Sequence, residues 1–142
     1  MNEGMNAQGP GNDEYETPKW LFEALDAEFG FTLDAAASHT NALCRVCFTK
    51  ESDGLMQTWG GHNVYVNPPY SDIVAWVTKA LEERDPCRVI VMLLPSRTGT
   101  EWFQRLLRAG VDIRFFRKRI RFCLNGVPEQ SPRFDSIIVV IR

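Results

Sequence analysis

The chain has 142 residues, 44% of them hydrophobic and 24% charged, with a net charge of −2. This composition suits one globular domain and excludes a disordered chain, a collagen-like fibre and a coiled coil. No apolar run reaches the roughly 18–20 residues of a membrane helix, and the start of the chain does not resemble a signal peptide. Four cysteines are too few for a disulfide scaffold. We therefore expect a cytoplasmic protein with no membrane contact.

The first half of the chain predicts short strands around one helix. Residues 1–13 contain glycine and proline without apolar periodicity, and we interpret them as a flexible N-terminal tail. Thr17 is a good N-cap and Pro18 suits a first helical turn, so they predict a helix that ends at Gly30. Apolar segments predict strands at 31–34, 45–49 and 63–66, with a turn at 35–38.

The second half predicts two helices and three strands. Residues 88–94 form a continuous apolar run, which is typical of a strand covered on both faces in a parallel sheet. The other expected elements are helices at 71–84 and 100–109 and strands at 111–116 and 137–141. Alternating strands and helices predict an α/β fold with a largely parallel sheet.

The tetrapeptide Asn67-Pro68-Pro69-Tyr70 follows a predicted strand, at the position where ligands bind in open α/β sheets. Two successive prolines stiffen the loop. The Asn67 amide and the Pro68 carbonyl can therefore accept hydrogen bonds from an exocyclic amine, and the Tyr70 ring can stack on a planar group. A proline-rich turn, or an exposed ligand for an adaptor domain, is the alternative, but the strand–turn–helix context favours a binding loop.

At this loop the chain resembles the S-adenosylmethionine-dependent amino-methyltransferases, whose catalytic loop is (Asp/Asn/Ser)-Pro-Pro-(Tyr/Phe/Trp). Over residues 14–142 it resembles the small phage-type DNA N6-adenine methyltransferases, the phage Dam-like family. The motifs that carry this resemblance are Glu16-Thr17-Pro18, Trp20-Leu21-Phe22, Glu28-Phe29-Gly30-Phe31, Leu33-Asp34-Ala35-Ala36, Asp53-Gly54-Leu55, Trp59, Val66-Asn67-Pro68-Pro69-Tyr70, Leu94-Pro95 and Arg119-Ile120-Arg121-Phe122. The resemblance implies one domain, residues 14–142, with a minimal Rossmann-like class I methyltransferase fold whose largely parallel sheet has an antiparallel C-terminal strand.

The resemblance also implies a reaction and a set of site residues. The chain would transfer a methyl group from S-adenosylmethionine to adenine N6 in double-stranded DNA, with the base flipped out of the duplex. Asn67, Pro68, Pro69 and Tyr70 would form the catalytic loop. The residues implied to bind the cofactor are Thr17 and Pro18 at its methionine end, Asp34 at its amino-acid moiety, Asp53 and Leu55 at its adenosine, and also Ala36. Ordinary turn or cap aspartates are the alternative for Asp34 and Asp53.

Charge is distributed unevenly along the chain. Residues 1–86 contain 5 Lys/Arg and 14 Asp/Glu, whereas residues 87–142 contain 11 Lys/Arg and 4 Asp/Glu. Five cations gather within eight positions: Arg114, Arg117, Lys118, Arg119 and Arg121. This cluster is either a phosphate-contacting patch or a solvated strand face. With the resemblance, we expect Arg97, Arg117, Arg119 and Arg121 to contact DNA, and residues 117–135 to form a small target-recognition insertion.

Alternative functions remain open at this point. A related catalytic loop also serves methylation of RNA bases and of protein side-chain amides. A catalytically idle DNA-binding module would predict a damaged loop, whereas the tetrapeptide is intact. Cys44 and Cys47 form a single Cys-x-x-Cys pair, and because a structural zinc usually needs two ligand pairs we expect no metal. A phage-encoded chain would act in the cytoplasm of the bacterial host, and the oligomeric state, a monomer included, is left open.

Overall fold

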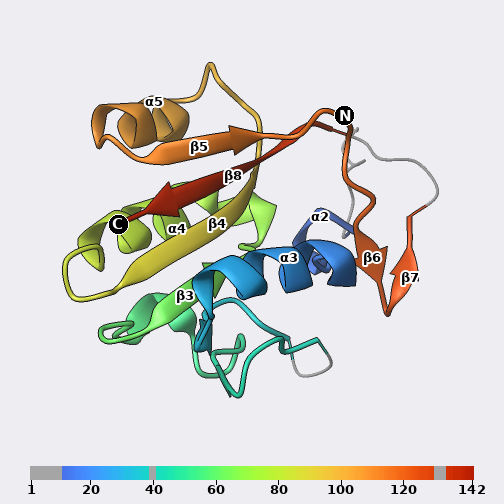
Figure 1. Ribbon diagram of the computed structural model, residues 1–142, viewed down its shortest axis with the longest axis horizontal. Helices are drawn as coiled ribbons and strands as arrows, with labels where there is room; N and C mark the ends of the chain where they lie inside the picture. Colours follow the sequence, from blue (N-terminus) through green and yellow to red (C-terminus); the bar gives the residue numbers. More distant parts are fainter. Residues whose placement is uncertain (1–10, 39–40, 130–133) are drawn as a thin grey trace.

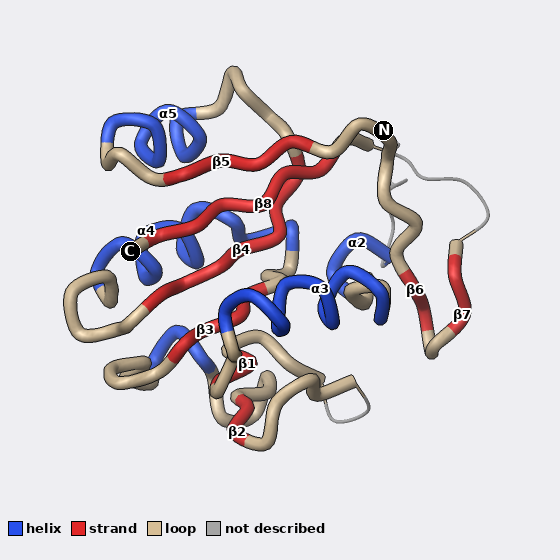
Figure 2. Tube along the Cα trace, in the orientation of Figure 1, coloured by secondary structure: helices blue, strands red, loops and turns tan. Residues whose placement is uncertain are grey.

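A six-stranded mixed sheet lies at the centre of the computed structural model, which describes residues 11–38, 41–129 and 134–142 (Figure 1). Its strands are β1 (Leu33–Asp34), β2 (Val46–Cys47), β3 (Asn63–Val66), β4 (Val89–Pro95), β5 (Asp112–Phe115) and β8 (Ser136–Ile141), in the order β2-β1-β3-β4-β8-β5 (Figure 2). Strands β1 to β4 are mutually parallel, and β8 is antiparallel to β4 and β5. The predicted Rossmann-like α/β class, with its antiparallel C-terminal strand, is confirmed.

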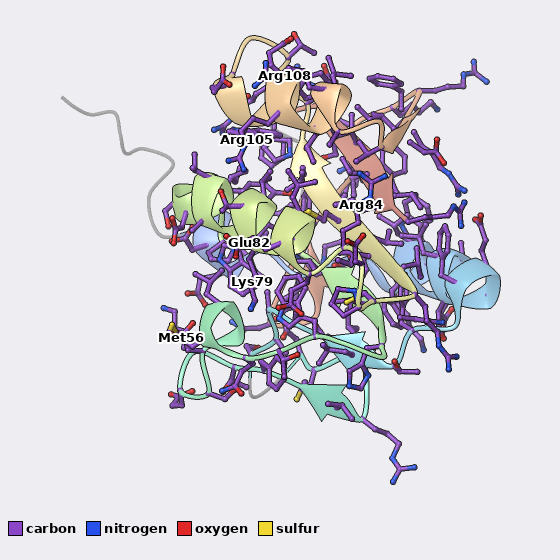
Figure 3. The ribbon with its side chains drawn as sticks, turned by 90° about the vertical axis from the view of Figure 1, so that its left-hand side faces the viewer. Met56, Lys79, Glu82, Arg84, Arg105 and Arg108 are labelled. Carbon is purple, nitrogen blue, oxygen red and sulfur yellow. The ribbon has the colours of Figure 1, made fainter. Side chains whose placement is uncertain are left out.

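Three helices cover the two faces of this sheet. They are α3 (Lys19–Phe29), α4 (Ile73–Glu82) and α5 (Glu101–Arg108). Figure 3 shows α4 and α5 on one side of the sheet and α3 on the other. Helix α5 begins where predicted, because the Thr100 hydroxyl accepts a hydrogen bond from the Phe103 N–H at 3.3 Å.

The core is densest at β4 and β8, which pair along six residues. Every residue of both strands is buried. Both faces of β4 are buried, as its uninterrupted apolar sequence predicts. This rigid centre holds the carboxyl ends of β3 and β4 in fixed positions, and the loops that follow them carry the tetrapeptide and Arg97.

The N-terminal segment departs from the prediction in two ways. Residues 11–14 form a short helix, α2 (Gly11–Glu14), so the predicted tail is wrong for residues 11–13, and residues 1–10 lie outside the described part of the chain. The cap of α3 is Pro18, not Thr17. The Thr17 hydroxyl instead lies 2.6 Å from the buried hydroxyl of Tyr65. This hydrogen bond gives each of the two buried hydroxyl groups a partner.

The basic segment also differs from an extended strand. Strand β5 ends at Phe115, and residues 116–122 belong to no strand, with a bend at Arg117 and Lys118, so the cations that follow Arg114 do not form a strand face. A hairpin that the sequence analysis missed follows, with β6 (Cys123–Leu124) and β7 (Val127–Pro128). Its turn residues, Asn125 and Gly126, have φ angles of 53° and 80°, the left-handed geometry that an Asn-Gly pair favours.

No helix in the described part of the chain is long and apolar enough to cross a membrane.

Candidate active site

A cleft of about 730 Å³ opens beside the carboxyl ends of β1 and β3. Parallel strands place ligand sites at this edge of a sheet. Five of the residues predicted for the site line the cleft: Ala36, Asp53, Leu55, Asn67 and Pro69. Segments that are far apart in the sequence therefore meet around one cavity. They lie before α3, after β1, around η1 (Gly54–Met56), after β3 and at the hairpin turn.

Acidic and apolar side chains together line the cleft. Its carboxylates are Asp13, Glu14, Glu16, Glu51, Asp53 and Asp72, whereas Lys50 is the one cation among the described lining residues. Ala35, Ala36, Leu55 and Trp76 supply apolar surface. Such a cavity favours a ligand that carries positive charge together with a planar or aliphatic portion.

The turn at Asp53 is pressed against the end of β1. A Cβ on Gly54 would lie 2.2 Å from the Ala35 carbonyl oxygen, so only glycine fits there. The Asp53 carboxylate accepts a hydrogen bond from the Leu55 N–H at 3.2 Å, and Trp59 Nε1 donates to the Gly54 carbonyl at 2.9 Å. Asp53 thus caps this turn, as the alternative interpretation had it, and also lines the cleft.

Asp34 lies behind the cleft wall and not in it. Its side chain is buried, and Oδ2 accepts a hydrogen bond from the Leu43 N–H at 3.0 Å. Burial raises the pKa of Asp34 to about 6, against the opposing effect of the backbone N–H groups of Leu43 and Ala36. The geometry therefore supports a role for Asp34 in holding the loop after β1, and does not support the direct cofactor contact that the resemblance implied.

The loop at residues 67–70 presents two carbonyl oxygens that have no partner among the described residues. Asn67 Nδ2 donates to the Tyr15 carbonyl at 2.9 Å, which fixes the amide and leaves Oδ1 without a donor. The nearby N–H groups of Ser71 and Asp72 donate to Asp13 and to the Pro69 carbonyl, so neither reaches the Pro68 carbonyl. Two unused acceptors at one site match the two hydrogens of a primary amine.

Tyr70 is covered by two other aromatic rings. Phe122 and Phe134 contact it edge to face, with centroid distances of 6.3 and 5.6 Å, and only 7% of Tyr70 is exposed. Its hydroxyl is buried without a hydrogen-bond partner among the described residues, and burial raises the pKa of this hydroxyl well above its ordinary value. Because Tyr70 is almost fully covered, a base can stack on its ring only after a neighbouring side chain moves.

The segment at residues 13–16 is part of the site, although the sequence analysis named only Glu16, as part of a motif, and gave none of these residues a role. The Asp13 carboxylate accepts hydrogen bonds from the Ser71 N–H and hydroxyl at 3.0 and 2.7 Å. The Glu16 carboxylate accepts from the N–H groups of Asn125 and Gly126 at 3.2 and 2.9 Å, and its backbone pairs with Cys123. By contrast, Thr17 and Pro18 are buried and do not line the cleft.

The predicted DNA contacts fall into two places. Arg117, Arg119 and Arg121 line a second groove, of about 590 Å³, together with Lys118 and the apolar side chains of Trp20, Phe116 and Ile120. Arg97 is exposed in the loop after β4, near enough to Tyr70 to oppose the rise of its pKa.

The surroundings of the four cysteines are known only for the described residues. All four thiols are free, and burial raises the pKa of Cys44 to about 12. Among the described residues no three His, Cys, Asp or Glu side chains gather closely enough to hold a metal ion. His39, the nearby donor in the sequence, lies outside the described residues.

Comparison with known proteins identifies the family. Residues 4–142 match the family model described as DNA N-6-adenine-methyltransferase (Dam). A protein named DNA N-6-adenine-methyltransferase from Escherichia phage T1 is 34% identical over 112 residues, which are 78% of this chain and 47% of that protein. One of the same name from Haemophilus phage HP1 (strain HP1c1) is 29% identical over 130 residues, 89% of this chain and 75% of that protein. This chain therefore spans about half the length of the phage T1 relative, and it belongs to the DNA N-6-adenine-methyltransferase (Dam) family.

Proposed function

We propose that this chain transfers a methyl group from S-adenosylmethionine to the N6 amine of adenine in double-stranded DNA. The observation that carries the proposal is a pair of acceptors without a partner in the described part of the chain, Asn67 Oδ1 and the Pro68 carbonyl, in a loop that borders the acidic cleft. Family membership and the names of both phage relatives support the same reaction.

The cleft fits the proposed methyl donor. S-adenosylmethionine carries a sulfonium and an ammonium group against one carboxylate, and six carboxylates with one lysine line the cavity. We expect Asp53 to accept a hydrogen bond from the adenosine amine, and Ala36 and Leu55 to pack on the apolar parts of the cofactor. When bound, the cofactor supplies an electrophilic methyl group.

The catalytic loop would act on the target amine. The N6 lone pair of adenine is delocalised into the ring, so this nitrogen is a weak nucleophile. Asn67 Oδ1 and the Pro68 carbonyl would accept its two hydrogens, favour a pyramidal nitrogen and offset the positive charge that develops on it. The Asn67 amide is already held by the Tyr15 carbonyl, so little reorganisation is required at the moment of reaction.

Duplex DNA must release the target base from its stack before the loop can reach it. We propose that Tyr70 then stacks on the flipped adenine, after displacement of Phe122 or Phe134, and that residues 117–135 act as the target-recognition insertion of a single domain, residues 14–142. Arg97, Arg117, Arg119 and Arg121 would contact the DNA backbone. Because both relatives come from phages, we expect the bacterial cytoplasm as the place of action.

The test is methyl transfer by the Asn67→Ala variant. Removal of one preorganised acceptor should slow incorporation of labelled methyl into duplex DNA on the order of 100–1000-fold. The affinity for S-adenosylmethionine, measured by calorimetry, should stay near that of the wild type, because Asn67 acts on the amine. Wild-type turnover in this variant would overturn the proposed role.

Asn63→Ala is the matched control. Asn63 lies at the other end of β3, and its amide also donates to backbone carbonyls, those of Phe29 and Gly30. This variant should lose stability without a comparable loss of methyl transfer. Parallel assays with RNA and with protein substrates decide between DNA and the alternatives, since preference of the wild type for either would contradict the DNA assignment.

A further inference from the structure

We propose that Trp20 and the bend at residues 117–121 form a groove that holds the DNA strand beside the target adenine, with the Trp20 indole stacked on a base or sugar. This inference rests on the proposed function, because it assigns a binding site to the same DNA substrate. Nothing in the resemblance gives Trp20 a role of this kind, and its apolar periodicity predicts a core or rim position.

Trp20 differs from the other three tryptophans of the chain. It is 59% exposed, whereas Trp59, Trp76 and Trp102 are at most 6% exposed. Trp20 is the second residue of α3, whose buried stripe consists of Leu21, Phe22, Leu25 and Phe29. Its large apolar side chain therefore lies on the outer side of the helix, where the core does not need it.

The facing wall of the groove carries uncompensated positive charge. Arg117 and Lys118 form no ion pair with any residue that the structure describes. Arg114, by contrast, makes two hydrogen bonds to the Glu28 carboxylate at 2.7 and 2.6 Å, and Arg119 pairs with Asp135 at 3.2 Å. Arg117 and Lys118 are thus the cations best able to neutralise phosphates.

Both walls of the groove connect directly to the catalytic loop. Phe122 directly follows the bend, and its ring contacts Tyr70. On the other wall, Thr17 precedes Trp20 by three residues and contacts Tyr65, two residues before Asn67. In Figure 1 the chain from β5 to β6 passes the N-terminal end of α3. A strand in this groove would therefore lie close to a base held at Asn67.

The chemistry of the groove selects a nucleic acid. Exposed aromatic side chains combined with cations along a groove are the usual means of holding a DNA strand, since the cations meet phosphates and the ring meets a base face. Charge complementarity favours DNA over an apolar protein segment. An acidic protein partner would also be attracted, but it would not require the indole ring.

Quenching of tryptophan fluorescence by acrylamide tests the inference on the intact protein. Trp20 is the accessible fluorophore, and the Trp20→Phe variant gives the baseline of the three buried tryptophans. Short duplexes of random sequence, at concentrations that saturate binding by fluorescence anisotropy of labelled DNA, should lower wild-type quenching toward that baseline. Acrylamide is neutral, so the positive charge of the groove does not raise its local concentration.

Two outcomes separate the inference from the proposed function. If DNA binds and wild-type quenching does not change, Trp20 stays exposed in the complex and the inference is overturned while the proposed function stands. If no DNA binds under any condition tested, the proposed function fails, and the inference fails with it.

Affinity measurements give a second readout. Trp20→Ala should weaken DNA binding about 5- to 150-fold, as expected for a stacking contact, whereas Trp20→Phe should stay within a few-fold of the wild type. Val74→Ala is the matched control, because Val74 is equally exposed, at 59%, on α4 across the sheet. Equal affinities of Trp20→Ala and the wild type would also overturn the inference.

Discussion

Residues outside the tetrapeptide hold the loop proposed to be catalytic in place. Tyr15 accepts the Asn67 amide and Asp13 accepts both Ser71 donors, so residues 13–16 fix the loop from one side. Proline rings fix it from within, since two φ angles are set covalently. An acceptor that is held before the substrate arrives requires no reorganisation during the reaction, which is the condition for effective electrostatic stabilisation.

The Tyr70 hydroxyl gives a prediction that separates ring from hydroxyl. Because this hydroxyl is buried without a partner among the described residues, Tyr70→Phe removes an unsatisfied polar group and should raise the free energy of unfolding by about 1–3 kcal/mol. Methyl transfer should be retained, whereas Tyr70→Ala should weaken it by loss of stacking. Denaturant unfolding and methyl-transfer assays measure the two effects. Equal loss of activity in both variants would assign the function to the hydroxyl.

Asp34 gives a prediction about pH. Burial raises its pKa from 3.8 to about 6, so the folded chain binds this proton more tightly than the unfolded chain. Ionisation of Asp34 therefore lowers stability as the pH rises from about 4 to about 6, by about 3 kcal/mol in total, and no further above that range. Asp34→Asn cannot ionise and lacks this dependence.

Urea unfolding of both proteins between about pH 4 and pH 7 checks this prediction. The free energy of unfolding of the wild type minus that of Asp34→Asn should fall as the pH rises, and should then level off. Subtraction removes the other titrating groups, such as Glu28, whose pKa is lowered by its hydrogen bonds to Arg114. A difference that does not depend on pH would show that Asp34 is hydrated in the folded protein.

At the scale of elements, the sequence predicts best where the signal is local. The apolar run of β4, the pattern of β3 and the Thr100 cap of α5 each lie within one segment, and all three elements form as predicted. The tetrapeptide is equally local, because its prolines stiffen it regardless of tertiary context.

Elements that depend on distant partners escaped prediction. Helix α2 has only four residues, which is too short for a helical pattern of apolar residues to show in the sequence. It packs on the segment after β3. The Asn125-Gly126 turn is a local hairpin signal, but the two flanking strands have only two residues each. Residues 13–16 contribute to the cleft through contacts with residues more than fifty positions away in the sequence. The pattern within a single segment cannot predict such contacts.

The η1 turn gives a prediction for an element as a whole. A Cβ at Gly54 would meet the Ala35 carbonyl, so Gly54→Ala should push the turn away from β1 and cost about 1–3 kcal/mol of stability. The displaced Asp53 and Leu55 should also bind S-adenosylmethionine more weakly, as calorimetry would show. Gly99→Ala is the control, since a Cβ there meets open space. Unchanged affinity in folded Gly54→Ala would remove this turn from the cofactor site.

The whole molecule separates its charges in a way that suits two ligands of opposite sign. The acidic cleft is built almost entirely from the first half of the chain, and the basic bend belongs to the second half. A cationic methyl donor and a polyanionic DNA strand would therefore each meet the complementary field, and each field would disfavour the other ligand. Salt should weaken DNA binding far more than cofactor binding, because only the polyanion releases condensed counterions.

The last prediction concerns which cations produce that salt dependence. The slope of log affinity against log salt is about −0.9 per phosphate neutralised on duplex DNA, so Arg117→Gln with Lys118→Gln should reduce its magnitude by up to about 2. Arg114→Gln with Arg119→Gln removes the same charge, but these arginines are paired with Glu28 and Asp135 and should change the slope less. Salt titrations of DNA binding for both double variants and the wild type provide the measurement. If the paired arginines changed the slope more, DNA binding would break their ion pairs with Glu28 and Asp135, and Arg117 and Lys118 would not be the main phosphate contacts.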